Sequence, residues 1–224
     1  MGFFGPSREE RYAAAAAAIA PFGFVVQEER AAELADWAPL QLHAAPESYE
    51  VAAFGRIEDS DVAVFEYGYS STDAEGQSHP HREMVVVAQH ARIEGGAAFA
   101  PDLREWSGIA QVLDALFWIP PFTFLKVIQW LGESRNPDRT VGHGEFDRLY
   151  RVRAASDASA QRAIPPRLRE TVVRLALRGT VELRPGAVIY SVAGCGFDGE
   201  GVLRALGYAA PLMVSATVEP QAYR

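Results

Sequence analysis

The segment His79-Pro80-His81 has the spacing of two metal ligands on one β-strand. Alternate residues of a strand project to the same side, so two imidazoles can share one ion, and Glu83 continues the same parity. His143 is a further candidate ligand that the fold would have to bring in through space. Such a set suits a metal-assisted hydrolase, although it matches no recognised motif such as His-Glu-x-x-His. The favoured alternative is a group of polar residues at the open end of a hairpin.

Two other groups contain residue types that occur in catalytic sites. The loop 142–147 combines glycines with His143, Glu145 and Asp147, which could act as a general acid and base. Equally, the glycines suit a turn, and Asp147 could accept hydrogen bonds from nearby backbone N–H groups. Cys195 lies between glycines and could be a nucleophile. A lone cysteine with no local histidine is more often a small packed residue, and this interpretation is favoured.

Common nucleotide and esterase motifs are absent from the sequence. It contains no Walker A motif, no Gly-x-Ser-x-Gly elbow and no glycine-rich dinucleotide motif after an expected strand. We therefore expect no cofactor.

Arginines concentrate in the second half of this acidic chain. Arg151 and Arg153 share one face of an expected strand, which predicts a site for an anion or an acidic partner. The favoured alternative is pairing with surface aspartate and glutamate, because solvated charge runs are common. The other members of this basic group are Arg148, Arg162, Arg167, Arg169, Arg174 and Arg178.

Residues 106–132 form a distinctly apolar segment that is rich in aromatic side chains. A membrane-spanning helix needs about 20 predominantly apolar residues, whereas Asp114, Lys126 and the pair Pro120-Pro121 divide this run into shorter pieces. We expect two amphipathic helices that meet at the prolines as a helical hairpin. The candidate contact residues are Leu113, Phe117, Trp118, Phe122, Phe124 and Trp130.

This helical hairpin has several alternative roles. Amphipathic helices usually bury their apolar face, so the hairpin could pack on the sheet as part of the core. If it is exposed, it would self-associate, bind a protein partner or make a peripheral membrane contact. A space between it and the sheet could instead carry a small apolar ligand.

Hydrophobic periodicity and turn residues predict the elements that position these groups. Ser7 and Glu10 form a capping box for a helix over 8–20, and a second helix is expected over 28–37. The remaining elements are strands at 50–58, 62–70 and 79–90 as an antiparallel meander, a strand at 146–154, a helix at 166–177, a hairpin over 180–193 that turns at 184–186, and a last helix at 198–206.

This order of elements predicts a single α+β domain with a largely antiparallel sheet, N-terminal helices and an apolar helical insert. The absence of alternating βαβ units argues against Rossmann and barrel folds. We expect residues 1–48 to form a helical segment packed on the main domain. Residues 49–210 would be the α+β domain with its insert at 106–132, and residues 211–224 a C-terminal tail.

The composition narrows the class of protein. A chain of 224 residues with 49% hydrophobic and 22% charged residues is long enough for a substantial core. Its net charge of -8 argues against a nucleic-acid partner. The single cysteine excludes an intramolecular disulfide and a cysteine-based zinc cluster. Because the N-terminal segment also lacks the order of an export signal, the expected location is cytoplasmic, with a membrane-peripheral position as the alternative.

Several strings resemble a family of uncharacterised bacterial proteins, a domain of unknown function. They are Phe-Glu-Tyr-Gly-Tyr at 65–69, Met-Val-Val-Val at 84–87, the segment 144–152, and the later segments 166–169 and 181–186. The resemblance covers roughly residues 49–206 and implies an aromatic hairpin, a valine-rich strand and a Phe-Asp strand. Members of the family often carry membrane-spanning segments ahead of this domain. The resemblance implies no activity and no catalytic residues.

The sequence therefore favours a non-enzymatic module for protein interaction or self-association that uses the apolar helical hairpin. The partner would be another protein or a second copy of the chain. The two alternatives are the metal-assisted hydrolase and the carrier of a small apolar ligand.

Overall fold

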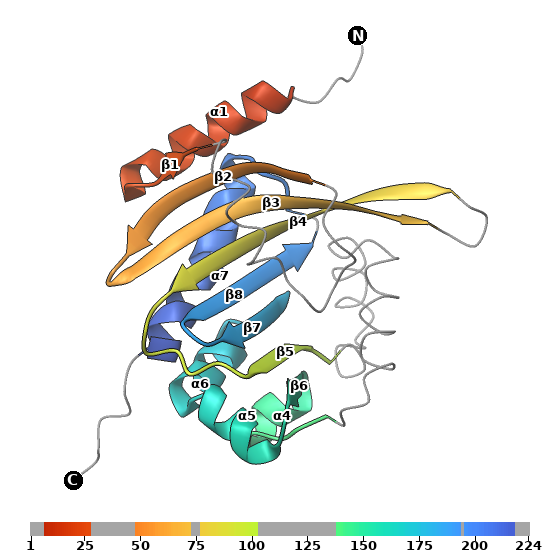
Figure 1. Ribbon diagram of the computed structural model, residues 1–224, viewed down its shortest axis with the longest axis vertical. Helices are drawn as coiled ribbons and strands as arrows, with labels where there is room; N and C mark the ends of the chain where they lie inside the picture. The colour runs from red at the N-terminus through yellow and green to blue at the C-terminus, as the bar shows by residue number, and fades with distance from the viewer. Residues whose placement is uncertain (1–6, 28–47, 73–76, 103–137, 194, 218–224) are drawn as a thin grey trace.

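One antiparallel sheet forms the centre of the molecule (Figure 1). The computed structural model describes residues 7–27, 48–72, 77–102, 138–193 and 195–217, and for residues 48–51, 67, 69–72 and 79–81 it describes the backbone alone. Within these residues eight strands follow the order β1-β2-β3-β4-β8-β7-β5-β6. The strands are β1 Val25–Val26, β2 Ser48–Ile57, β3 Ser60–Thr72, β4 Ser78–Gln89, β5 Ala97–Pro101, β6 Tyr150–Ala154, β7 Thr180–Arg184 and β8 Ala187–Ala193.

Five α-helices accompany the sheet in the described residues, which confirms the predicted α+β class. Helix α7 crosses the sheet and packs against α1, whereas α4, α5 and α6 gather at the β5–β6 end (Figure 1). None of these helices has both the length and the apolar character needed to cross a membrane. Their bounds are α1 Arg8–Ile19, α4 Gly144–Leu149, α5 Asp157–Ala163, α6 Pro166–Arg174 and α7 Gly199–Thr217, and the 3-10 helix η1 Ala20–Phe22 follows α1.

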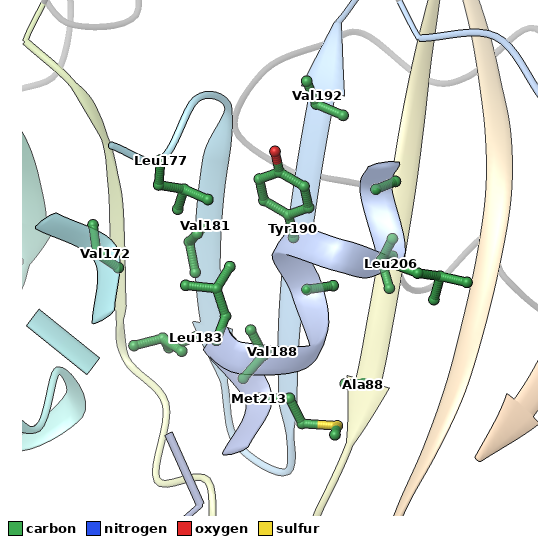
Figure 2. Packing of buried hydrophobic residues seen from close by; sticks show 14 of the residues in the cluster. Ala88, Val172, Leu177, Val181, Leu183, Val188, Tyr190, Val192, Leu206 and Met213 are labelled. Atoms are coloured by element: carbon green, nitrogen blue, oxygen red, sulfur yellow. The ribbon is translucent and has the colours of Figure 1, made fainter. Parts of the chain in front are cut away.

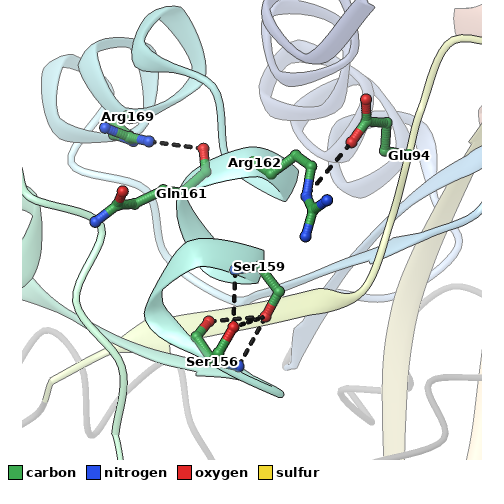
Figure 3. Close-up of polar contacts among 6 residues, drawn as sticks. All are labelled: Glu94, Ser156, Ser159, Gln161, Arg162 and Arg169. Atoms are coloured by element: carbon green, nitrogen blue, oxygen red, sulfur yellow. Dashed lines mark hydrogen bonds and ion pairs between the residues drawn. The ribbon is translucent and has the colours of Figure 1, made fainter.

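Side chains satisfy the first backbone N–H groups of two helices. At α1 the Ser7 hydroxyl accepts from the Glu10 N–H at 3.2 Å, and the Glu10 carboxylate accepts from the Ser7 N–H at 2.7 Å. This is the predicted capping box. At α5, Ser156 and Ser159 exchange equivalent bonds of 2.8 and 3.1 Å (Figure 3). Such caps stabilise a helix end by about 1 kcal/mol each.

The two faces of the sheet bury different sets of side chains. On the first face, side chains from the helices and from alternate strand positions form the main hydrophobic core. Figure 2 shows part of it, where Val172 of α6, Tyr190 of β8 and Met213 of α7 project over the same face. On the second face the buried cluster contains strand residues only, among those described: Ala52, Ala63, Phe65, Val85, Val87, Ala187 and Ile189.

The predicted hairpins are confirmed. Strands β2, β3 and β4 form the expected meander in register from Ile57↔Ser60 to Thr72↔Ser78. Strands β7 and β8 form the expected hairpin, with its turn at Pro185 and Gly186. The meander and this second hairpin join where β4 pairs with β8.

The predicted strand over 146–154 is wrong in its first half. Residues 144–149 form α4, and only Tyr150–Ala154 form β6. His143 caps this helix, and Glu145 and Asp147 lie in its first turn, where a helix favours negative charge. Phe146 and Tyr150, four residues apart, stack with ring centroids at 5.1 Å. The helix cap, the carboxylates of the first turn and this ring stacking therefore favour a helix more than the alternating apolar pattern favours a strand.

The predicted C-terminal tail from residue 211 is also wrong as far as the structure describes it, because α7 continues through Pro211 to Thr217. Proline inside a helix costs about 3 kcal/mol. Leu212 and Met213 are fully buried beyond it, and burying two such side chains contributes about 1.5–3 kcal/mol each. Packing on the sheet therefore balances or exceeds the cost of the proline.

Other differences are smaller. Helix α6 ends at Arg174 rather than at residue 177, and β5 and α5 lie in segments where no element was predicted. The expected helix over 28–37 and the apolar segment 106–132 lie outside the described residues.

Candidate functional site

The predicted metal ligands are not brought together as one group. Glu83 is buried on β4, at the position paired with Ala193 of β8. His143 precedes α4, which leads into β6 at the far edge of the sheet. Strands β4 and β6 are four strand spacings apart, or about 19 Å. The side chains of His79 and His81 lie outside the description, and among the described residues no three His, Cys, Asp or Glu side chains are placed to hold a metal ion.

The loop 142–147 uses its polar groups for local structure. The Asp147 carboxylate accepts three backbone N–H groups, from Val141 at 2.8 Å and from Gly142 and His143 at 3.0 Å. His143 Nδ1 accepts from the Phe146 N–H at 3.2 Å. Gly142 has a φ of 76°, which a glycine adopts readily. These contacts confirm that Asp147 accepts hydrogen bonds from nearby backbone N–H groups, although residues 144–147 begin helix α4 rather than a turn before a strand.

Arg151, one of the two arginines of the predicted anion site, contacts an acidic residue of the same chain. Arg151 Nε donates to Asp138 at 2.9 Å, and its Nη2 contacts the same carboxylate oxygen. Burial lowers the pKa of Arg153, and Asp138 partly offsets that effect. Elsewhere in the basic group, Arg162 lies 4.0 Å from Glu94 and Arg169 donates to the Gln161 carbonyl at 2.9 Å (Figure 3). Arg151 and Arg162 therefore pair with acidic residues of the same chain, whereas Arg169 binds the backbone.

Cys195 is buried, and burial raises the pKa of its thiol. Arg204 partly offsets this effect, whereas Asp198 and Glu200 add to it. A thiol is a far weaker nucleophile than a thiolate. The structure thus agrees with a small packed residue at this position.

Glu182 is a buried carboxylate on β7. Arg184 Nη2 donates to it at 2.6 Å and Arg184 Nε at 3.0 Å. Burial nevertheless raises the pKa of Glu182 above its ordinary value of 4.5, because the charged form loses more hydration than Arg184 restores. The ionised carboxylate therefore destabilises the folded state relative to the protonated form.

We expect the stability of the protein relative to its Glu182→Gln variant to fall as pH rises. The folded pKa lies above the unfolded one, so the penalty is absent below about 4.5 and is fully present above the folded pKa. Thermal melts of both proteins at about pH 4 and at neutral pH measure the difference. A difference in Tm that is the same at both pH values would contradict the buried, desolvated state of Glu182.

A pocket of about 290 Å³ opens on the first face of the sheet, between the α6–β7 connection, β8 and α7. The pocket combines apolar walls with two arginines and two tyrosines. Tyr190 rises from β8 beside Val192 in Figure 2. Its lining residues are Leu175, Ala176, Arg178, Tyr190, Val192, Arg204 and Tyr208.

The α6–β7 connection is held in place by unusual backbone positions. Ala176 has a φ of 45°, a left-handed conformation that is uncommon outside glycine. Gly179 has a φ of 99°, and a Cβ there would lie 2.3 Å from the Ser191 carbonyl oxygen. This position admits only glycine and lets the connection approach β8 closely. The Tyr150 hydroxyl lies 3.2 Å from the Leu177 carbonyl oxygen and so helps to fix the connection.

Of the two tyrosines of the pocket, Tyr190 is fully buried and Tyr208 is half-buried. The Tyr190 hydroxyl donates to the Arg178 carbonyl at 2.6 Å, and burial raises the pKa of this phenol well above its ordinary value of 10.0. Its ring lies 6.1 Å from that of Tyr208, tilted by 50°. Because Tyr190 stays neutral and guanidinium groups do not release protons at ordinary pH, the lining offers positive charge and aromatic surface but no base. Such a lining suits binding rather than proton transfer.

Sequence reasoning singled out Cys195 and the arginine concentration, but not this pocket. Its residues come from a connection, a strand and a helix, and no spacing along the chain relates Arg178 to Arg204. Only the pairing of β7 with β8 and the packing of α7 bring them together.

No family model, no curated protein and no solved structure matches this chain. The family suggested by residues 65–69 and 144–152 therefore stays a prediction.

Proposed function

We propose that this protein is a non-enzymatic interaction module that associates with a second copy of itself. The observation that carries the proposal is a two-stranded arm, residues 69–72 of β3 and 78–82 of β4, which extends beyond the rest of the sheet (Figure 1). Strand β2 reaches β3 only as far as Gly68, and β8 reaches β4 only at Glu83. Among the described strands, none pairs with either edge of the arm.

An arm of this kind is suited to strand addition. Two strands alone are marginally stable in water, and their edges present backbone N–H and C=O groups to another strand. The edge of β4 contains Pro80, which has no N–H to donate. The edge of β3 over 69–72 contains no proline, so it is the edge at which a second copy would pair, antiparallel about a twofold axis.

The register identifies which backbone groups face outward. Pro80 lies opposite Ser70, and a residue without an N–H cannot exchange both bonds of a hydrogen-bonded pair. Ser70↔Pro80 is therefore a non-hydrogen-bonded pair, and the N–H of Ser70 points away from β4. A partner strand would use this N–H, whereas the arm itself does not.

The experiment measures the mass of the full chain in solution by analytical ultracentrifugation at millimolar concentration. We expect a dimer for the wild type and a monomer for Ser70→Pro, because proline removes the outward N–H without removing a bond of the arm. Ser70→Ala keeps this N–H and is expected to remain dimeric. A monomeric wild type would overturn the proposal. A dimeric Ser70→Pro variant would show that the arm is not part of the dimer interface.

We assign the apolar segment 106–132 to the same interface on sequence grounds. Four residues of strand pairing bury little area, whereas a stable interface buries about 1,200–2,000 Å². Aromatic residues such as Phe117 and Trp118 would supply this area. The double change Phe117→Ser and Trp118→Ser should give a folded monomer. Loss of the folded state in circular dichroism would favour the core interpretation of this segment instead.

A further inference from the structure

We propose that the pocket between the α6–β7 connection, β8 and α7 binds a small carboxylate that carries an aromatic or branched apolar body. This site lies on described residues only and goes beyond the proposed self-association, which uses the arm at another part of the sheet.

The volume of the pocket limits the size of the ligand. About 290 Å³ is the liquid volume of roughly ten water molecules. It lies just below the usual range for ligand sites, which begins at about 300 Å³. A ligand of about ten non-hydrogen atoms therefore fits inside the pocket.

The charge of the lining selects an anion. Arg178 and Arg204 come from different elements, and none of the lining residues is acidic. Arg204 forms an i,i+4 ion pair with Glu200, whose side chain is 80% exposed. An ion pair at such an exposed position is worth little. A carboxylate that enters the pocket can therefore compete with Glu200 for Arg204, because a guanidinium binds carboxylates through two parallel hydrogen bonds.

The rest of the lining selects an apolar body. Leu175, Ala176 and Val192 supply aliphatic walls, and the half-buried Tyr208 supplies an aromatic ring, which packs at 6.1 Å against the fully buried ring of Tyr190. Aromatic pairs prefer such edge-to-face and offset arrangements. An inorganic anion would leave these apolar walls in contact with water. The ligand therefore needs both a negative charge and an apolar body to bind well.

The test uses the full-length protein and isothermal titration calorimetry with three probes. We expect phenylacetate to bind with a Kd below about 1 mM. Phenylacetamide has the same shape without the charge and should bind at least about tenfold more weakly. Inorganic phosphate has charge without the ring and should also bind at least about tenfold more weakly. Equal affinity for the amide would overturn the role of the arginines, and equal affinity for phosphate would overturn the role of the apolar walls.

Matched variants locate the site. Arg178→Gln and Arg204→Gln should each weaken phenylacetate binding about tenfold. Arg167→Gln, an exposed arginine of α6 outside the pocket, should bind as the wild type does. Loss of binding in all three variants, or in none, would place the probe elsewhere and overturn the proposal. No saturable binding of phenylacetate to the wild type would overturn it as well. None of these outcomes depends on the mass measured for the arm variants, so the two proposals fail separately.

Discussion

Replacing Phe146 with alanine is expected to reduce the free energy of unfolding by about 3–5 kcal/mol. Phe146 is fully buried at the β5–β6 end of the sheet, stacked on Tyr150 at 5.1 Å and edge-on to Phe99 at 5.3 Å. Its removal leaves a cavity that the surrounding strands cannot fill, because β5 and β6 are paired along their full length. Urea denaturation monitored by circular dichroism measures the change through the midpoint at constant m-value.

Phe22 provides the matched control for this change. Its side chain is 62% exposed at the end of η1, so Phe22→Ala should alter the free energy of unfolding by less than about 0.5 kcal/mol. A loss below about 1 kcal/mol for Phe146→Ala would show that the three aromatic rings do not form part of a close-packed core.

The parts of the fold that local signals specify were predictable. The Ser7–Glu10 capping box, the meander of β2, β3 and β4 and the β7–β8 hairpin all depend on residues close in sequence. The segment 144–149 contained contrary evidence, since a strand would place Arg148 on the same face as Phe146 and Tyr150. The acidic residues after His143 favoured a helix start. The alternation of apolar and polar residues over 150–154 instead led to the prediction of a strand that began too early.

The remaining features depend on contacts that sequence periodicity does not reveal. Helix α7 passes through Pro211 because Leu212 and Met213 are buried beyond it, an effect of tertiary packing. The pocket depends on the close approach of the α6–β7 connection to β8 at Gly179. Neither feature follows from spacing along the chain, because each needs the position of one element relative to another.

The buried carboxylate of Glu66 is the site of the second large expected effect. Glu66 lies on β3 with 1% of its side chain exposed, and its Oε2 accepts from the Phe197 N–H at 2.7 Å. Its Oε1 lies 3.2 Å from Arg82 Nη1. Glu66→Ala leaves a buried N–H without its acceptor and is expected to cost about 2–4 kcal/mol in urea denaturation.

Two variants separate the hydrogen bond from the ion pair. Arg82 is 47% exposed, so solvent screens its charge, and Arg82→Gln should cost less than about 1 kcal/mol. Glu66→Gln keeps an oxygen that can accept from the Phe197 N–H and should be less destabilising than Glu66→Ala. If Arg82→Gln were as destabilising as Glu66→Ala, the ion pair and not the bond to the backbone would be the main contribution.

The position of Phe197 extends this prediction to α7. Phe197 immediately precedes Asp198, whose Oδ1 accepts from the Gly201 N–H at 2.8 Å at the start of the helix. Glu66→Ala should therefore loosen the first turn of α7 and reduce the hydrogen-exchange protection of residues 201–204 more than that of β7 and β8. Arg204 belongs to this stretch and lines the pocket, so the same variant should also weaken phenylacetate binding. Uniform loss of protection across the sheet and α7 would instead show that Glu66 supports global stability alone.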